Sequence, residues 1–170
     1  MQRRQFEDIA QIQNLAHPPR TPHRDPFVEL RQSLPSQVEA ISAFVDQFML
    51  FIASHREADG SEIDIEIAPR AALTNAIVHG NGESPNKRVY VVCRSSAYGE
   101  LSITVRDQGQ GFDHRAVPNP TAPEKRLSTH GRGIYLMRAF MDEVCFEEGG
   151  SVVHMRKMPN AGSAAQWNLE

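Results

Sequence analysis

The chain has 170 residues and a mass of 19.0 kDa, which suits one domain with a single core and short tails. Hydrophobic residues make up 40% of it and charged residues 23%, a balance that argues against a disordered or fibrous chain. The formal net charge of −3 argues against a broad nucleic-acid-binding surface, because nucleic acid backbones are held mainly by clustered lysine and arginine.

The first elements are expected to be a strand and a helix that follow a flexible N-terminal arm. Residues 1–25 have a short helix-like start and then a proline-rich, basic stretch that discourages regular structure. Residues 27–30 predict a short strand. Ser36 and Glu39 stand at capping-box spacing, so a helix is expected to begin there and to end before Asp59. Its apolar stripe is expected to be Val38, Ile41, Val45, Phe48 and Ile52.

A second helix and a β-hairpin follow. The helix must carry the apolar residues of 73–77, and Pro69 would either begin it or kink it. Residues 89–93 are mostly apolar, and residues 101–105 alternate apolar with polar side chains. With a turn between them, the two runs predict an antiparallel hairpin.

A third amphipathic helix and a second hairpin complete the pattern. Residues 144–146 and 152–155 lie on either side of Glu148-Gly149-Gly150, as the strands of a hairpin would. This order of elements favours an α+β fold, a two-layer sandwich with a mostly antiparallel sheet and helices on one face. The spacing of the third helix runs through Ile134, Met137, Met141 and Val144.

One domain is expected over residues 26–158, with a loose C-terminal tail over residues 159–170. No apolar run approaches the roughly 20 residues that span a bilayer, and the start of the chain lacks the apolar core of a secretory signal, so a cytoplasmic protein is expected. Cys93 and Cys145 are the only cysteines and lie in apolar, strand-like runs. Two buried, reduced thiols are therefore expected, rather than a disulfide or a thiolate metal site.

Three short segments can carry chemistry, and the first lies on the expected second helix. Asn75 and His79 are four residues apart and so project from the same helical face, just before Gly80-Asn81. The carboxamide oxygen of Asn75 is a ligand that Mg²⁺ accepts. Taken alone, such a residue is more often a helix cap or a surface position.

The second segment, Asp107 to Phe112, follows directly after a predicted strand and contains Gly109 and Gly111. An aspartate in this place can accept a hydrogen bond from an exocyclic amine, and the glycines let a ligand approach the backbone without meeting a Cβ. A plain strand-ending turn has the same composition.

The third segment, His130-Gly131-Arg132-Gly133, stands at the entrance to the third helix. Backbone N–H groups at a helix N-terminus point toward an anion, and Arg132 adds positive charge. A flexible loop at a helix start would have the same residues. Neither a P-loop nor a strand–GxGxxG–helix unit occurs in the sequence, so the two commonest phosphate cradles are excluded.

In order and spacing, the three segments resemble the N, G1 and G2 boxes of the GHKL ATPase superfamily. The run GRGIYLMRAFMDEV and the hairpin after it are similar, more specifically, to the RsbW and SpoIIAB type of anti-sigma-factor serine kinase. The resemblance covers residues 26–157 and implies the Bergerat-type ATP-binding fold. It also implies a homodimer through the N-terminal strand and helix.

The resemblance implies ATP and Mg²⁺ as ligands. Asn75 would ligate the metal and Asp107 would bind the adenine amine, while residues 113–129 would form a short ATP lid. The glycines of the second box would shape the base pocket, and the third box would lie under the phosphates. The further residues that it places at the nucleotide are His79, Asn81, Gly109, Gly111, Phe112, Gly131, Arg132 and Gly133.

One position departs from the pattern of these kinases. A glutamate normally stands one helical turn before the asparagine, where its carboxylate can polarise the attacking hydroxyl, and here that position is Ala71. Glu66 lies nine residues before Asn75, about half a turn off its face at roughly 100° per residue. ATP binding is expected to survive the change, while phosphoryl transfer loses the base catalysis that supplies about 10²- to 10⁴-fold.

Two functions follow from the resemblance. The first is a serine/threonine-protein kinase that acts on a STAS-type anti-anti-sigma protein and regulates transcription by partner switching. The second, favoured by Ala71, is a catalytically weakened, nucleotide-gated module that sequesters a sigma factor or a STAS-domain protein. A detached catalytic domain of a sensor histidine kinase is a third alternative, and the short lid argues against it. Neither nucleic acid nor a membrane is an expected partner.

Overall fold

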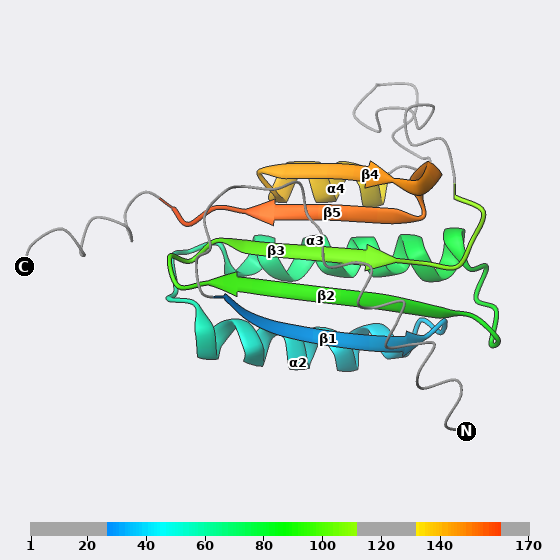
Figure 1. Ribbon diagram of the computed structural model, residues 1–170, viewed down its shortest axis with the longest axis horizontal. Helices are drawn as coiled ribbons and strands as arrows, with labels where there is room; N and C mark the ends of the chain where they lie inside the picture. Colours follow the sequence, from blue (N-terminus) through cyan, green and yellow to red (C-terminus); the bar gives the residue numbers. More distant parts are fainter. Residues whose placement is uncertain (1–26, 112–131, 161–170) are drawn as a thin grey trace, which may run out of the picture.

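The computed structural model describes residues 27–111 and 132–160, which form one sheet with helices packed on one of its faces (Figure 1). The sheet has five strands in the order β1-β2-β3-β5-β4, and every neighbouring pair is antiparallel. The expected α+β sandwich is confirmed.

The elements have the following bounds. The strands are β1 (Phe27–Pro35), β2 (Arg88–Ser96), β3 (Leu101–Arg106), β4 (Glu143–Glu147) and β5 (Val152–Lys157). The helices are α2 (Ala40–His55), α3 (Glu62–Thr74) and α4 (Arg132–Phe140), with the π-helical turn η1 (Asn75–Gly80) and the 3-10 turn η3 (Glu148–Gly150). Both predicted hairpins are present, as β2–β3 and β4–β5.

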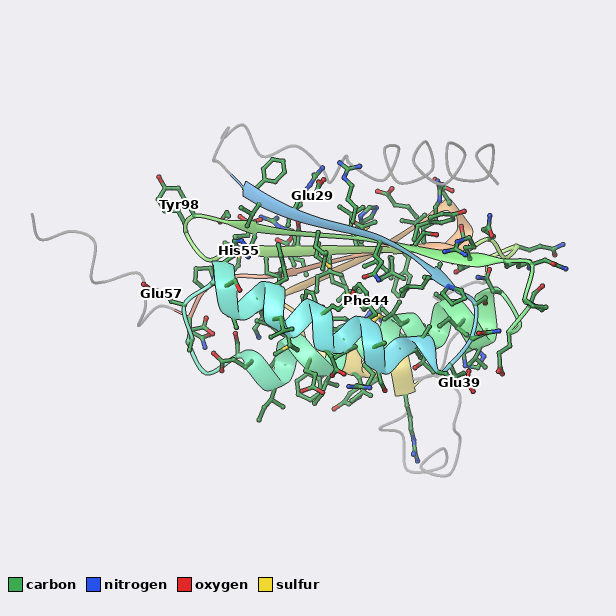
Figure 2. All side chains as sticks on the ribbon, turned by 90° about the horizontal axis from the view of Figure 1, so that it is seen from below. Glu29, Glu39, Phe44, His55, Glu57 and Tyr98 are labelled. Carbon is green, nitrogen blue, oxygen red and sulfur yellow. The ribbon has the colours of Figure 1, made fainter. Side chains whose placement is uncertain are left out.

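The main hydrophobic core lies between the helices and the sheet, as the side view in Figure 2 shows. Because side chains alternate along a strand, every second residue of β3 points toward the helices: Leu101, Ile103 and Val105 are at most 1% exposed. Helix α2 contributes Ile41, Phe44, Val45, Phe48 and Ile52 to the same core. No helix within the described part of the chain is long and apolar enough to cross a membrane.

The capping-box prediction at Ser36 is wrong. Helix α2 begins at Ala40, and the Ser36 Oγ is buried without a hydrogen-bond partner among the described residues. The backbone explains the difference, because Ser36 N–H still bonds to the Lys87 carbonyl and so continues the pairing of β1 with β2. Val38 therefore precedes the helix and is 42% exposed, and Phe44 joins the apolar stripe instead.

The second helix starts earlier than its apolar residues suggested. Helix α3 begins at Glu62, so Pro69 lies within it and does not begin it. A proline there lacks the N–H that would bond to the carbonyl four residues earlier. From Asn75 the chain continues as the wider turn η1, which the sequence did not predict.

Two predictions at the third helix and the second hairpin are also corrected. Helix α4 ends at Phe140, and Val144 lies in β4, from which it packs against the core. Cys145 is exposed, because strand alternation turns it away from the face that holds Val144 and Phe146. Cys93 is buried and free as expected, and burial raises the pKa of its thiol far above the usual value.

Several predictions fall outside the described residues. They are the N-terminal arm over residues 1–25, the lid over residues 113–129, most of the tail over residues 159–170, and the site positions Phe112 and Gly131.

Candidate functional site

A small cavity lies where α3, η1 and α4 meet the ends of β3 and β5. It brings together Asn75 and Asp107, which are 32 positions apart in the sequence. The two side chains come from opposite layers of the fold, the helix layer and the sheet. The lining residues are Ala72, Asn75, Ala76, Val105, Asp107, Met137, Phe146, Gly150, Ser151 and Val153.

Asp107 is the ionisable side chain of this cavity. It is only 9% exposed, and its Oδ1 accepts a hydrogen bond of 2.7 Å from the Gly109 N–H. Burial raises the pKa of the Asp107 carboxyl, while the bond from Gly109 and the positive charges of Lys87 and Arg106 oppose that shift. Within the described residues no hydrogen bond reaches Oδ2, so this oxygen can accept a proton donor from a ligand.

Two glycines bring backbone into contact with the Asp107 carboxylate. A Cβ built on Gly80 would stand 2.3 Å from the Asp107 Cγ. A Cβ built on Gly109 would stand 2.1 Å from the Gly80 carbonyl oxygen and 2.8 Å from the Asp107 Oδ1. Side chains at these two positions would therefore displace the carboxylate or the turn that holds it.

The Asn81 side chain links the end of η1 to the sheet through two hydrogen bonds. Its Oδ1 accepts a 2.8 Å hydrogen bond from the Gln108 N–H, and its Nδ2 donates a 2.9 Å bond to the Arg88 carbonyl. The side chain is 3% exposed and both ends of its amide are used within the protein. Asn81 thus positions the turn that carries Asp107, whereas His79 is exposed and does not line the cavity.

The segment of residues 130–133 contacts the segment that carries Asn75 where α3 packs against α4. A Cβ built on Gly133 would stand 2.6 Å from the Asn75 Oδ1, so the backbone of α4 lies directly against the Asn75 carboxamide. Arg132, the first residue of α4, is exposed. The structure therefore brings one residue from each of the three segments, Asn75, Asp107 and Gly133, to the same end of the sheet.

The backbone hydrogen bonds at both ends of η1 differ from a regular α-helical pattern. The Asn75 N–H bonds to the carbonyls of Ala71 and Ala72, and the Asn81 N–H bonds to the Ala76 carbonyl five residues before it. A π-helical turn of this kind is a feature found frequently at functional sites. The Glu83 N–H donates a hydrogen bond to the Ile77 carbonyl and so caps the C-terminal end of η1.

Gly111 packs against the backbone of the turn η3, next to the cavity-lining Gly150, and its replacement is expected to destabilise the fold. It has φ +76°, and a Cβ there would stand 2.2 Å from the Gly149 carbonyl oxygen. We expect Gly111→Ala to lower the free energy of unfolding by about 2 to 4 kcal/mol, measured by urea denaturation. The matched control is Gly82→Ala, with φ +62° and open space around the Cβ, which is expected to cost only about 1 kcal/mol. Equal losses in the two variants would refute the steric argument.

Sequence reasoning missed several parts of this site. Gly80 was visible beside His79, but nothing in the sequence indicated that it faces the Asp107 carboxylate. Gly150 and Ser151 belong to the second hairpin, and they reach the cavity because the Asp107 N–H bonds to the Ser151 carbonyl. Contacts of this kind depend on the sheet order, in which β3 pairs with β5 rather than with β4.

Comparison with known proteins gives consistent matches. The histidine kinase-like ATPase domain family matches residues 32–157. An anti-sigma F factor of Heyndrickxia coagulans is 38% identical over 93 residues, which are 51% of this chain and 62% of that protein. The serine-protein kinase RsbW of Staphylococcus epidermidis is 27% identical over 139 residues, 77% of this chain and 86% of its own. An anti-sigma F factor of Clostridium perfringens is 36% identical over 102 residues, 57% and 72% of the two chains.

Proposed function

The chain belongs to the histidine kinase-like ATPase domain family, and from this premise we propose that it binds ATP with Mg²⁺ and regulates a sigma factor by partner switching. The observation that carries the proposal is the cavity shared by Asn75 and Asp107, with glycine backbone packed against both side chains. We place the protein in the cytoplasm, where such a partner would be met.

In this proposal Asp107 selects the base. A buried carboxylate that lines the cavity, with one oxygen bonded to the Gly109 N–H and no described hydrogen bond to the other, matches an exocyclic amine, which donates protons. The pKa of Asp107 is raised by burial, so a donor that arrives with the ligand favours the charged carboxylate again. Apolar neighbours such as Met137 and Phe146 line the same cavity and suit a flat aromatic ring.

Asn75 is proposed as the metal ligand. Its Oδ1 lies against the Gly133 backbone at the start of α4, and the N-terminus of a helix favours an anion. An amide oxygen at a phosphate site fits the oxygen ligands of Mg²⁺, which when bound neutralises phosphate charge. Arg132, exposed at the first position of α4, adds positive charge on the same side.

The partner is proposed from the names of the relatives. Two of them are anti-sigma F factors and one is a serine-protein kinase, so a sigma factor and a STAS-type anti-anti-sigma protein are the partners to examine. The catalytically weakened module is the second candidate, because Ala71 occupies the position where a base would be expected. A homodimer through the edge strand β1 and helix α2 belongs to the same proposal.

Binding of purified partners tests the proposal. We expect the full chain to retain a purified sigma factor or STAS-domain protein from the same organism with an affinity that changes at least about tenfold between ADP and ATP, both with Mg²⁺. Asn75→Ala should abolish this nucleotide dependence. Thr74→Ala, which alters the exposed neighbouring residue, should leave it unchanged. Retention that is identical with and without nucleotide for both partners would contradict partner switching.

A further inference from the structure

The face of the sheet turned away from the helices carries a small apolar cluster. It consists of Tyr90 and Val92 on β2 and Val152 on β5. The register sets them side by side across β3, because Tyr90 and Val152 both pair with Arg106. We call these three residues the outer-face cluster.

The outer-face cluster is buried although no described element covers it. Tyr90, Val92 and Val152 are only 2%, 3% and 2% exposed. Helices α2, α3 and α4 all lie on the opposite face, and nothing within residues 27–111 and 132–160 crosses the outer one (Figures 1 and 2). Side chains on a sheet face without a second layer remain open to water from above, so this burial requires a cover.

We propose that the cover is the N-terminal segment, residues 1–26, packed against the outer face of the sheet. The described chain begins on that side: the Phe27 ring lies 4.8 Å from the Arg94 guanidinium, and strand pairing puts both residues on the outer face. Phe27 pairs with Ser96, and Tyr90 lies six residues further along β2, about 20 Å away. Eleven extended residues span at most about 36 to 40 Å, so the proline-rich stretch of residues 16–26 can bring the helix-like start of the chain over the cluster.

Residues 1–26 contain apolar side chains at a spacing that suits the outer-face cluster. Phe6, Ile9 and Ile12 recur every three residues, a spacing that gathers apolar side chains along one side of a helix. Glu7 and Asp8 stand among them.

Two arginines border the cluster, and each is ion-paired with a carboxylate of the described chain, Arg31 with Glu29 and Arg106 with Glu148. Arg31 on β1 stands directly across from Val92, and Arg106 on β3 stands beside both Tyr90 and Val152. The match between the segment and the outer-face cluster is therefore one of apolar side chains.

Two other ends of undescribed segments lie on the helix side of the sheet, the start of the C-terminal tail and the end of residues 112–131. Asn160, the last described residue, is held by Asp59 in the loop between α2 and α3, through bonds of 3.0 Å to Oδ2 and 2.9 Å to the carbonyl. Asp59 is fixed by Arg56, and both side chains are at most 3% exposed. The tail after Asn160 therefore starts on the helix side, as does Arg132 in α4, which ends the segment of residues 112–131.

Thiol labelling of the full chain tests the proposal. Val92→Cys puts a thiol into the outer-face cluster with little change of volume. Two natural thiols serve as references, Cys145, exposed on the same face, and Cys93, buried on the helix face. Each rate is read by peptide mass mapping and divided by the rate of the same thiol in the denatured chain. We expect the introduced thiol to react at least about tenfold more slowly than Cys145.

Substitutions in the segment identify the cover. Ile9→Asp should bring the rate of the introduced thiol to within about threefold of Cys145, whereas Gln11→Asp, which adds the same charge on the opposite side of the helical pattern, should leave it slow. Phe6→Ser, which removes an aromatic contact without adding charge, should also raise the rate. Cys93 should stay unlabelled throughout, which shows that the domain remains folded.

Three results would overturn the proposal. The first is a rate for the introduced thiol equal to that of Cys145 with the segment unaltered. The second is protection that survives both Ile9→Asp and Phe6→Ser. The third is protection that appears only as the protein concentration is raised, because the cover would then be a second copy of the chain.

Discussion

Replacing Ala71 by glutamate is expected to raise the rate of γ-phosphate transfer to a STAS-type partner by about 10²- to 10⁴-fold, the usual contribution of a positioned general base. The geometry supports this position, because the Asn75 N–H bonds to the Ala71 carbonyl, so the two residues are one turn apart. Ala72, the next residue, lines the cavity. A carboxylate at position 71 would therefore stand beside the proposed phosphate site, within reach of an attacking hydroxyl.

The measurement is a single-turnover assay with radiolabelled γ-phosphate and purified partner. Ala71→Gln is the matched control, since it adds nearly the same volume without a base, and it should transfer as slowly as the unmodified chain. Glu66 is unsuited to replace the missing group, because it forms an ion pair of 3.1 Å with Arg70 on a partly exposed side of α3. Transfer by the unmodified chain as fast as by Ala71→Glu would refute the weakened-module candidate.

Asp107→Asn is expected to weaken binding of a non-hydrolysable ATP analogue with Mg²⁺ by about 10- to 100-fold. The change replaces an acceptor-only carboxylate by a group that also donates, and the loss of a hydrogen bond to a charged group is worth about 1.5 to 3 kcal/mol. The bond that Oδ1 accepts from the Gly109 N–H can be kept by the asparagine oxygen, so the turn should persist. Isothermal titration gives the two affinities.

The control separates base recognition from general charge effects. Asp46→Asn removes one negative charge from the exposed side of α2 and should leave the affinity unchanged. The unmodified chain should also prefer the adenine analogue to the inosine analogue, which lacks the exocyclic amine, and Asp107→Asn should narrow that preference. Equal affinities of Asp107→Asn and the unmodified chain for the ATP analogue would contradict the proposed role of Asp107 in binding adenine.

The elements predicted from the sequence are those with strong local signals. The hairpin around Gly99 has two apolar runs with a turn between them, and the structure forms it as β2 and β3. The apolar stripe of α2 was predicted for four of its buried residues, because a period of three to four residues needs no information from the rest of the chain.

The wrong predictions share one cause. In each case the structure at the residue depends on strand pairing with residues elsewhere in the sequence. Ser36 does not cap a helix because α2 begins only at Ala40, while the Ser36 N–H continues the strand pairing by bonding to Lys87, 51 positions away. Cys145 is exposed because the register of β4 against β5 turns it outward, and the register is fixed by the whole sheet. At the candidate site, the sequence indicated the residue types, while the contact of Gly80 with Asp107 required the fold.

The wide turn η1 has a consequence for how this region tolerates insertions and deletions. A π-helical turn contains one residue more than the α-helix that it interrupts, so deleting one residue between Ala76 and Gly80 would let a regular ladder form. The residues after the turn would then keep close to their present orientation, because the wide turn is what absorbs the extra residue. A deletion in the regular part of α3 would instead rotate everything after it by about 100° and shift it by about 1.5 Å. The Asn81 side chain could then no longer hydrogen-bond to both the Gln108 N–H and the Arg88 carbonyl. The helix layer would lose these two bonds to the sheet beside Asp107.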